Sequence, residues 1–460
     1  MPTVTSVPGV YIEEDASPRI SVNQRATAIP LFVGRFSPLE PVLTGVITRI
    51  DSWLDYSTLF NSSLSSSARI SVTSTPISPS TKEEQPETES SKAASKSLAA
   101  KESKKYTYRI DETEVLEPIA SVALSLYFQN GGGSCYIYPL ENADDNTKLS
   151  VLPSQIDEVE DITLLACPDS DDAYRNAVYD ALVASLGQHK GYFLLADSHD
   201  GLVPKGVSNA AQVAVYYPSF VRPYTRKIDD TQVVIDGYLD DSDKAIATLA
   251  ALRLVNADFA GEIDKALADK LATPLLIPPS SLMAGVYAKT DRERGVWKAP
   301  ANVVLNGVSE VSIRVTDEQQ ADLNPKGINV IRHFSDRGLV VWGSRTQQDD
   351  DDWRYISVRR LFDAAERDIK KALQPMVFEP NSQPTWKRVQ TAIENYLYRL
   401  WQQGALAGNK AEEAYFVHVD KGLTMTQDDI NQGKMIIQVG MAAVRPAEFI
   451  ILKFTQDMSQ

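Results

Sequence analysis

The middle of the chain alternates short apolar runs with a longer amphipathic stretch. Residues 161–169, 191–198 and 212–220 read as strands, because they are short, rich in β-branched and aromatic residues and bounded by turn residues. Between the first two, residues 172–188 place apolar side chains three and four positions apart, as a helix does. This alternation predicts a parallel or mixed sheet covered by helices.

The C-terminal third contains two strongly periodic helical patterns, over residues 356–373 and 385–404. Strand-like apolar runs follow at 414–420, 434–444 and 447–456. The N-terminus also opens with an apolar strand pattern. Both ends of the chain are therefore strand-like, which termini rarely are unless something holds them in place.

Two regions break these patterns. Residues 61–105 hold 14 serines and no aromatic residue, so they cannot bury enough apolar surface to offset the entropy lost on ordering. We expect them to form a flexible insertion. Residues 274–300 read as a loop-rich connector with one or two short helical turns, because prolines and glycines punctuate them.

Composition limits the class of protein. A length of 460 residues suggests about two to four domains, and 43% hydrophobic with 23% charged residues is usual for soluble globular proteins. No apolar stretch is long enough to span a bilayer and no signal peptide is recognisable, so we expect synthesis in a cytosol. The net charge of −15 argues against a nucleic-acid partner. Cys135 and Cys167 lie in apolar runs and are expected to be buried free thiols.

Candidate catalytic chemistry is sparse. The four histidines lie far apart, and no nucleophile-elbow, phosphate-loop or zinc-binding motif occurs. Asp169 and Asp197 each follow an apolar strand, where α/β sheets bind ligands, so a metal-dependent phosphoryl-transfer enzyme is one hypothesis. Short acidic residues more commonly cap helices and start turns. We therefore favour a structural or interaction protein that is not an enzyme and needs no cofactor or metal.

Eight sequence blocks carry a resemblance that extends over most of the chain. They are PGVYIEE (8–14), NGGGSCYIYPL (130–140), PPSSLMAGVYAKTDRERGVWKAPAN (278–302), LNPKGINVIR (323–332), VVWGSRT (340–346), WRYISVRRLFD (353–363), FEPN (378–381) and PAEFIILKF (446–454). Together they resemble the contractile tail sheath family of phage tails, R-type bacteriocins and extracellular contractile injection systems. The insertion 61–105 is similar to the longer sheaths of antifeeding-prophage-like and Photorhabdus-virulence-cassette-like particles.

The resemblance implies a mixed α+β subunit with several domains. An inner domain that packs around a tube would combine residues 21–40 with 325–445, and residues 41–324 would form an inserted outer domain. The resemblance also implies that two arms, residues 1–20 and 446–460, extend from this body.

The apolar chain ends could complete a neighbouring subunit's sheet by strand addition. The residues expected to make this exchange are Val10, Tyr11, Ile12, Phe449, Ile450, Ile451 and Leu452. The alternative is that both ends add to the subunit's own sheet. Basic residues of the helix 356–373 are candidates for contact with an acidic tube, or else form a solvated helix face: Arg359, Arg360, Arg367, Lys370 and Lys371.

The implied function is mechanical. Subunits, alone or with sheath paralogues, would stack as hexameric rings around an inner tube protein and contract from a metastable state to drive the tube through an envelope. Baseplate and terminator or cap proteins would be further partners, without nucleic acid or direct membrane insertion. Assembly would take place in the bacterial cytoplasm, before release as a phage-tail-like particle or virion tail. A tail-terminator or baseplate ring protein that shares the inner domain is the alternative.

Overall fold

The structure of the chain is a computed structural model that divides into two compact units, which we describe separately. Unit 1 comprises Met1–Asn61, Ile119–Val221 and Leu276–Gln460, and unit 2 comprises Ser62–Pro118 and Arg222–Leu275. The residues that the structure describes are 20–61, 66–76, 104–114, 119–142, 145–186, 191–208, 210–223, 228–240, 242–272 and 274–451.

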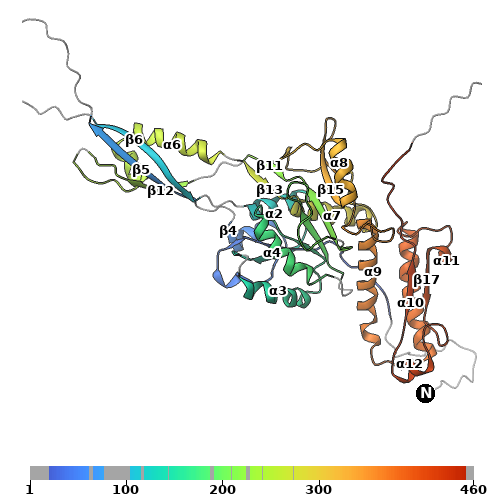
Figure 1. Cartoon of the computed structure of the whole chain (residues 1–460). Helices are drawn as coiled ribbons and strands as arrows, with labels where there is room; N and C mark the ends of the chain where they lie inside the picture. Colours follow the sequence, from blue (N-terminus) through green and yellow to red (C-terminus); the bar gives the residue numbers. More distant parts are fainter. Residues whose placement is uncertain are drawn as a thin grey trace, which may run out of the picture. The chain divides into compact units, whose positions relative to one another are not determined.

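An eight-stranded sheet forms the centre of unit 1 (Figure 1), in the order β16-β15-β10-β9-β8-β1-β7-β3. Its strands are β1 (Pro30–Gly34), β3 (Thr48–Ile50), β7 (Cys135–Pro139), β8 (Leu164–Ala166), β9 (Phe193–Asp197), β10 (Val213–Tyr217), β15 (Ile328–Phe334) and β16 (Gly338–Trp342). The inner strands run parallel, and the edge strands β3 and β16 pair antiparallel with their neighbours. Strands buried on both faces need apolar side chains at every position, which explains the continuous apolar runs of β7 to β10.

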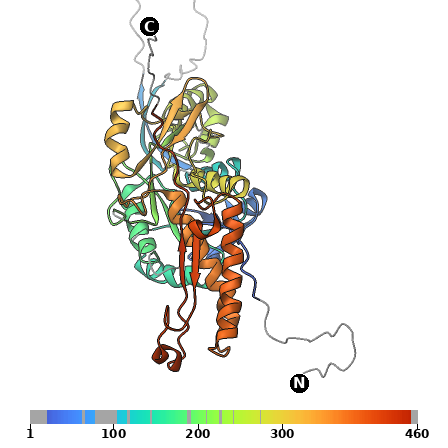
Figure 2. The same cartoon turned by 90° about the vertical axis from the view of Figure 1, so that its right-hand side faces the viewer.

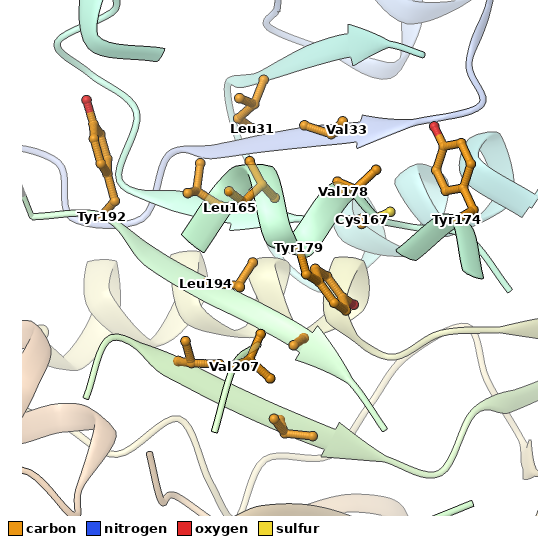
Figure 3. Packing of buried hydrophobic residues seen from close by; sticks show 14 of the residues in the cluster. Leu31, Val33, Leu165, Cys167, Tyr174, Val178, Tyr179, Tyr192, Leu194 and Val207 are labelled. Carbon is orange, nitrogen blue, oxygen red and sulfur yellow. The ribbon is translucent and has the colours of Figure 1, made fainter. Parts of the chain in front are cut away.

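Helices cover both faces of this sheet. On one face α4 (Asp172–Val183), beside α3 (Asn146–Glu158), packs its residues Val178 and Tyr179 into a core with Leu31 and Val33 of β1 (Figure 3). On the other face lie α2 (Ile119–Gln129) and α7 (Ser280–Arg294). There the ring of Phe32 meets that of Tyr127 with centroids 5.1 Å apart. Successive residues of β1 thus enter two different cores, as the pleat of a strand requires.

The C-terminal third forms its own core in unit 1 around two helices, α9 (Ile356–Leu373) and α10 (Gln383–Gln402). A two-stranded antiparallel sheet of β17 (Tyr415–His418) and β18 (Gln438–Met441) packs beside α10 (Figure 2). Val22 from the N-terminal segment is buried in the same core. The N-terminal segment and the C-terminal third therefore pack together in unit 1.

Shorter elements of unit 1 connect these parts. They are β2 (Ser37–Pro38), η1 (Pro41–Leu43), α1 (Trp53–Leu59), β4 (Phe60–Asn61), β11 (Phe220–Arg222), β14 (Glu310–Val311), α8 (Asp317–Leu323), η2 (Asn324–Lys326), η3 (Gln374–Met376), α11 (Ala411–Ala414) and α12 (Gln427–Asn431). The short strand β13 (Leu275–Ile277) begins at the last residue of unit 2. None of the helices in the described part of the chain is long and apolar enough to cross a membrane.

Unit 2 corrects the prediction of a flexible insertion at 61–105. Its sheet contains β5 (Ser66–Pro76), which lies within that range, between β12 (Ile228–Asp236) and β6 (Lys104–Glu114). Helices α5 (Leu249–Val255) and α6 (Ala257–Leu271) supply the rest of the core. The prediction was wrong for residues 66–76 because Ala68, Ile70 and Val72 alternate with serines and arginine, so that a serine-rich strand still buries one face. Residues 77–103 lie outside the described residues.

Two other predictions also need correction. The strands β1, β15 and β16 belong to the central sheet, although the predicted inner domain, 21–40 with 325–445, included all three. Pairing across a parallel sheet joins strands that are distant in sequence, so periodicity alone could not assign them. The predicted connector 274–300 contains the 15-residue helix α7, whose prolines precede its first turn, where proline is tolerated. The mixed α+β class is confirmed, and Cys135 and Cys167 are buried and free.

Candidate subunit interface

The C-terminal segment is held to unit 1 at Glu448. The Arg345 Nη2 donates to Glu448 Oε2 at 2.8 Å and its Nε donates to Oε1 at 3.0 Å, a forked charge-assisted pair. The Asn324 amide donates to Oε1 at 2.8 Å and the Tyr355 hydroxyl donates to Oε2 at 3.3 Å. We call Asn324, Arg345, Tyr355 and Glu448 the Glu448 clamp.

Electrostatics favour the ionised form of this carboxylate. Partial burial by itself raises the pKa of Glu448, but the hydrogen bonds from Arg345, Asn324 and Tyr355 outweigh it, so the pKa lies below its ordinary value. Each clamp residue comes from a different block of the resemblance, 323–332, 340–346, 353–363 and 446–454. Sequence analysis did not predict the clamp. The signal that could have indicated it is Glu448 itself, a single glutamate directly before an apolar run.

Directly after the clamp the chain presents bare apolar side chains. Phe449 is 71% exposed, Ile450 81% and Ile451 80%. Three neighbouring large apolar side chains with this exposure are typical of an interaction surface. The other predicted exchange residues, Leu452 and Val10, Tyr11 and Ile12, lie outside the described residues.

The β17–β18 ribbon is a candidate acceptor for an added strand. It comprises two strands among the described residues, and its ladder runs from Tyr415 opposite Met441 to His418 opposite Gln438. A two-stranded ribbon is marginal by itself, and a strand at the edge of a sheet can pair with an added strand. Phe416 on this ribbon is 43% exposed.

The prediction that Arg359 and Arg360 face a tube was wrong, because both are buried inside the subunit. Arg359 pairs with Asp363 at 2.7 Å, one helical turn away, and lies 4.1 Å from the ring centroid of Trp353. Arg360 pairs with Asp291 at 2.6 Å and also donates to the Thr27 carbonyl at 2.8 Å. Ion pairs that leave water need partners within the fold, so these side chains are not available to another protein.

Arginines also hold the N-terminal segment to the C-terminal core. Arg367 donates to the Ala26 carbonyl at 2.8 Å, and Arg399 of α10 donates to the Val22 carbonyl. Arg367 is therefore also engaged inside the subunit. Lys371 pairs with Glu160 at 2.5 Å while Lys370 is exposed, so Lys370 remains the open tube candidate among the five predicted residues.

The two candidate catalytic aspartates have structural partners. Asp197 accepts the Ser280 amide at 2.7 Å, at the first turn of α7, and the Tyr179 hydroxyl at 3.4 Å. Burial raises the pKa of Asp197 to about 6, although the charge of Arg175 partly offsets this rise. Asp169 accepts from Arg35 and from the Asp171 amide, both at 2.9 Å. Within the described residues no cluster of three or more His, Cys, Asp or Glu side chains is arranged to hold a metal ion.

Two family models match the chain. The phage tail sheath protein central domain matches residues 145–347, and the phage tail sheath C-terminal domain matches residues 348–457. Together the two matches span more than half of the chain. The chain belongs to the phage tail sheath family.

Solved sheath structures resemble this sheath protein over its whole length. A chain of the contracted anti-feeding prophage (AFP) helical sheath is 62% identical, with 99% of this chain and 100% of that chain covered and a TM-score of 0.72. A chain of the AFP baseplate is also 62% identical with the same coverage and a TM-score of 0.71. A chain of the contracted sheath complex of the extracellular contractile injection system PVC is 36% identical, with 99% of both chains covered and a TM-score of 0.65.

Curated sheath proteins match over shorter stretches. A prophage major tail sheath protein of Pseudomonas aeruginosa (strain UCBPP-PA14) is 26% identical over 175 residues, which are 37% of this chain and 44% of that protein. The chain spans less than half the length of the curated relatives that it matches.

Proposed function

We propose that this sheath protein polymerises helically around an inner tube and contracts to drive that tube through a target envelope. The observation that carries the proposal is the full-length match, at 62% identity, to a chain of the contracted AFP helical sheath. The mechanism needs no bond-making step in the subunit. Free energy would be stored in subunit interfaces, and contraction would repack near-rigid subunits.

Exchange of terminal strands would keep the subunits connected during this movement. The exposure of Phe449, Ile450 and Ile451 next to an anchored Glu448 supports an arm that leaves its own subunit. The β17–β18 ribbon is the proposed acceptor, since an added strand would enlarge a sheet that has two strands among the described residues. Residues 1–20, with Val10, Tyr11 and Ile12, would act as the arm at the other end.

Contact with the tube is proposed for exposed basic residues only. Lys370 is one of them. Arg294, Lys298 and Arg445 surround a cavity of about 400 Å³ whose wall includes Trp297, and they offer a second positive surface. Polar contacts of this kind suit an interface that has to hold and then release. Each exposed charge contributes little alone. We therefore expect binding to an acidic tube to be lost only when Lys370, Arg294, Lys298 and Arg445 are replaced together by acidic residues.

Negative-stain electron microscopy of the full-length chain, alone and with its tube partner, tests the proposal. Long striated cylinders are expected. Closed rings would instead indicate a terminator or baseplate role, and dispersed monomers in both conditions would refute the sheath function.

Truncation separates strand exchange from folding. A variant that lacks residues 1–14, and a variant with serine at 449–451, should fold but form no tubes. The matched control places serine at Leu254 and Val255 of unit 2, which are 89% and 50% exposed, and should assemble normally. Normal tubes from the arm variants would contradict strand exchange.

A further inference from the structure

The Glu448 clamp lies where the anchored body of unit 1 gives way to exposed apolar chain. Upstream, the Val444 amide donates to the Ala405 carbonyl at 3.1 Å. Downstream, the apolar residues begin at position 449 with no intervening linker. The clamp residue is therefore the root of the C-terminal arm.

We propose that Glu448 is the positioning residue that fixes where the C-terminal arm leaves the subunit and where tension from a neighbouring subunit enters it. This inference rests on the proposed strand exchange and assigns that exchange its anchor.

The donors of the clamp belong to different parts of unit 1. Asn324 opens η2, which leads into β15 of the central sheet; Arg345 follows β16 at the edge of that sheet; and Tyr355 directly precedes α9. Arg345 is tied further into the sheet region, because its amide donates to the Asn329 side chain of β15 at 2.7 Å. A pull on the arm is thus divided between the central sheet and the C-terminal core.

Forked geometry suits this task. A guanidinium that meets both carboxylate oxygens resists rotation as well as extension, which a single lysine contact would not. The side chains of Arg345 and Glu448 are 13% and 20% exposed, so salt screens the pair less than it screens an open surface pair. The anchor should therefore survive the ionic strengths in which such particles work.

Loss of the clamp would lengthen the free part of the C-terminal segment. The last anchored residue would then be Val444, whose amide is hydrogen-bonded to Ala405, so residues 445–448 would be released. Four extended residues span about 13 Å, so the arm would gain up to that much slack. Slack of this size is comparable to the width of a few strands in a sheet, enough to lose the register between neighbours.

Spin-label distances in the free subunit test the anchor directly. Labels at Ala447→Cys and Lys387→Cys, both exposed positions of unit 1, can be attached selectively because the native cysteines are buried. The wild-type background should give one narrow distance distribution. Glu448→Gln, which keeps the shape and removes the charge, should broaden it and raise the population of the released arm roughly tenfold.

A matched control and a rescue keep the test specific. Glu379→Gln neutralises a partly buried glutamate of the same core whose nearest cation, Arg388, lies 3.8 Å away, and it should leave the distribution unchanged. The exchange of partners in Arg345→Glu with Glu448→Arg should narrow the distribution again relative to either single variant. An unchanged distribution in Glu448→Gln would overturn the proposal.

Sheath order in the electron microscope supplies the second readout. If Glu448→Gln broadens the spin-label distance distribution, its tubes should be shorter and irregular. Regular full-length tubes from this variant would refute the positioning role of Glu448 but not the sheath function. If the wild-type chain itself makes no tubes, the proposed function fails and this inference falls with it, whatever the label distances.

Discussion

Replacement of Asp291 by Asn should strongly destabilise unit 1, because it leaves a buried arginine without a charged partner. Arg360 is 3% exposed, and its Nη1 and Nη2 donate to the two carboxylate oxygens of Asp291 at 3.0 and 2.6 Å. The guanidinium also lies 4.6 Å from the ring centroid of Tyr287. Burial alone lowers the pKa of Arg360, but the charge and hydrogen bonds of Asp291 outweigh it and hold the pKa above its ordinary value. An arginine side chain keeps its proton in proteins even without such a partner, so Arg360 stays charged when Asp291 is neutralised.

The expected magnitude follows from this burial. Removal of one partner of a buried pair costs about 3–5 kcal/mol of unfolding free energy, since the remaining charge is left uncompensated. Thr27 still offers its carbonyl to Arg360, so we expect the lower end, about 3 kcal/mol. Replacement of both partners by apolar residues, Arg360→Met with Asp291→Leu, also removes the unpaired charge of the guanidinium. That double variant should lose only about 1–2 kcal/mol.

Urea unfolding of the full chain, followed by tryptophan fluorescence, measures both variants. The reasoning requires the double variant to be more stable than Asp291→Asn. A cost below about 1 kcal/mol for Asp291→Asn, or additive costs in the double variant, would refute it.

Three further predictions concern positions where the structure makes the outcome specific. A Cβ at Gly285 would lie 2.4 Å from the Tyr127 carbonyl oxygen. Gly285→Ala should therefore force α2 and α7 apart and lower the unfolding free energy, measured by thermal unfolding, by about 1–3 kcal/mol. Gly261→Ala on α6, where a Cβ would meet no atom within 4 Å, should instead stabilise the protein by about 0.5–1 kcal/mol. Burial raises the pKa of Asp197 to about 6, so the native state holds this proton more tightly than the unfolded chain does. The resulting contribution to stability is complete below about pH 4 and is lost as the pH rises through 6. Asp197→Asn should therefore flatten the dependence of the unfolding free energy on pH between about pH 4 and 6. The Asn256 side chain accepts the Phe259 amide at 3.1 Å at the start of α6, so Asn256→Ala should cost about 1 kcal/mol by circular dichroism melting, and Asn256→Asp should not.

Local features of the chain could be predicted from sequence because they depend on neighbours in sequence. The strands β8, β9 and β10 and the helices α9 and α10 follow from apolar periodicity within one segment. The family resemblance also rests on short blocks in order. These signals identified a mixed α+β sheath subunit before any contact was known.

Partners of the charged residues could not be predicted in this way. Arg359, Arg360 and Arg367 lie on an amphipathic helix, where periodicity assigns them to a polar and therefore exposed face. The fold instead places Asp291 and the Thr27 carbonyl against Arg360, and the Ala26 carbonyl against Arg367. These groups are 69 or more positions away in sequence. Burial then turns a solvated face into an internal network.

The same division applies to the chain ends. Sequence alone predicted an apolar, strand-like pattern at both termini, because apolar patterning belongs to the residues themselves. The described part of the C-terminal run, residues 447–451, forms no strand within this chain. Only the tertiary structure decided that Arg345 holds Glu448, since the guanidinium meets the carboxylate from 103 positions away. Which polar groups meet across such separations depends on the path of the whole chain, and no local pattern of hydrophobic and polar residues encodes it.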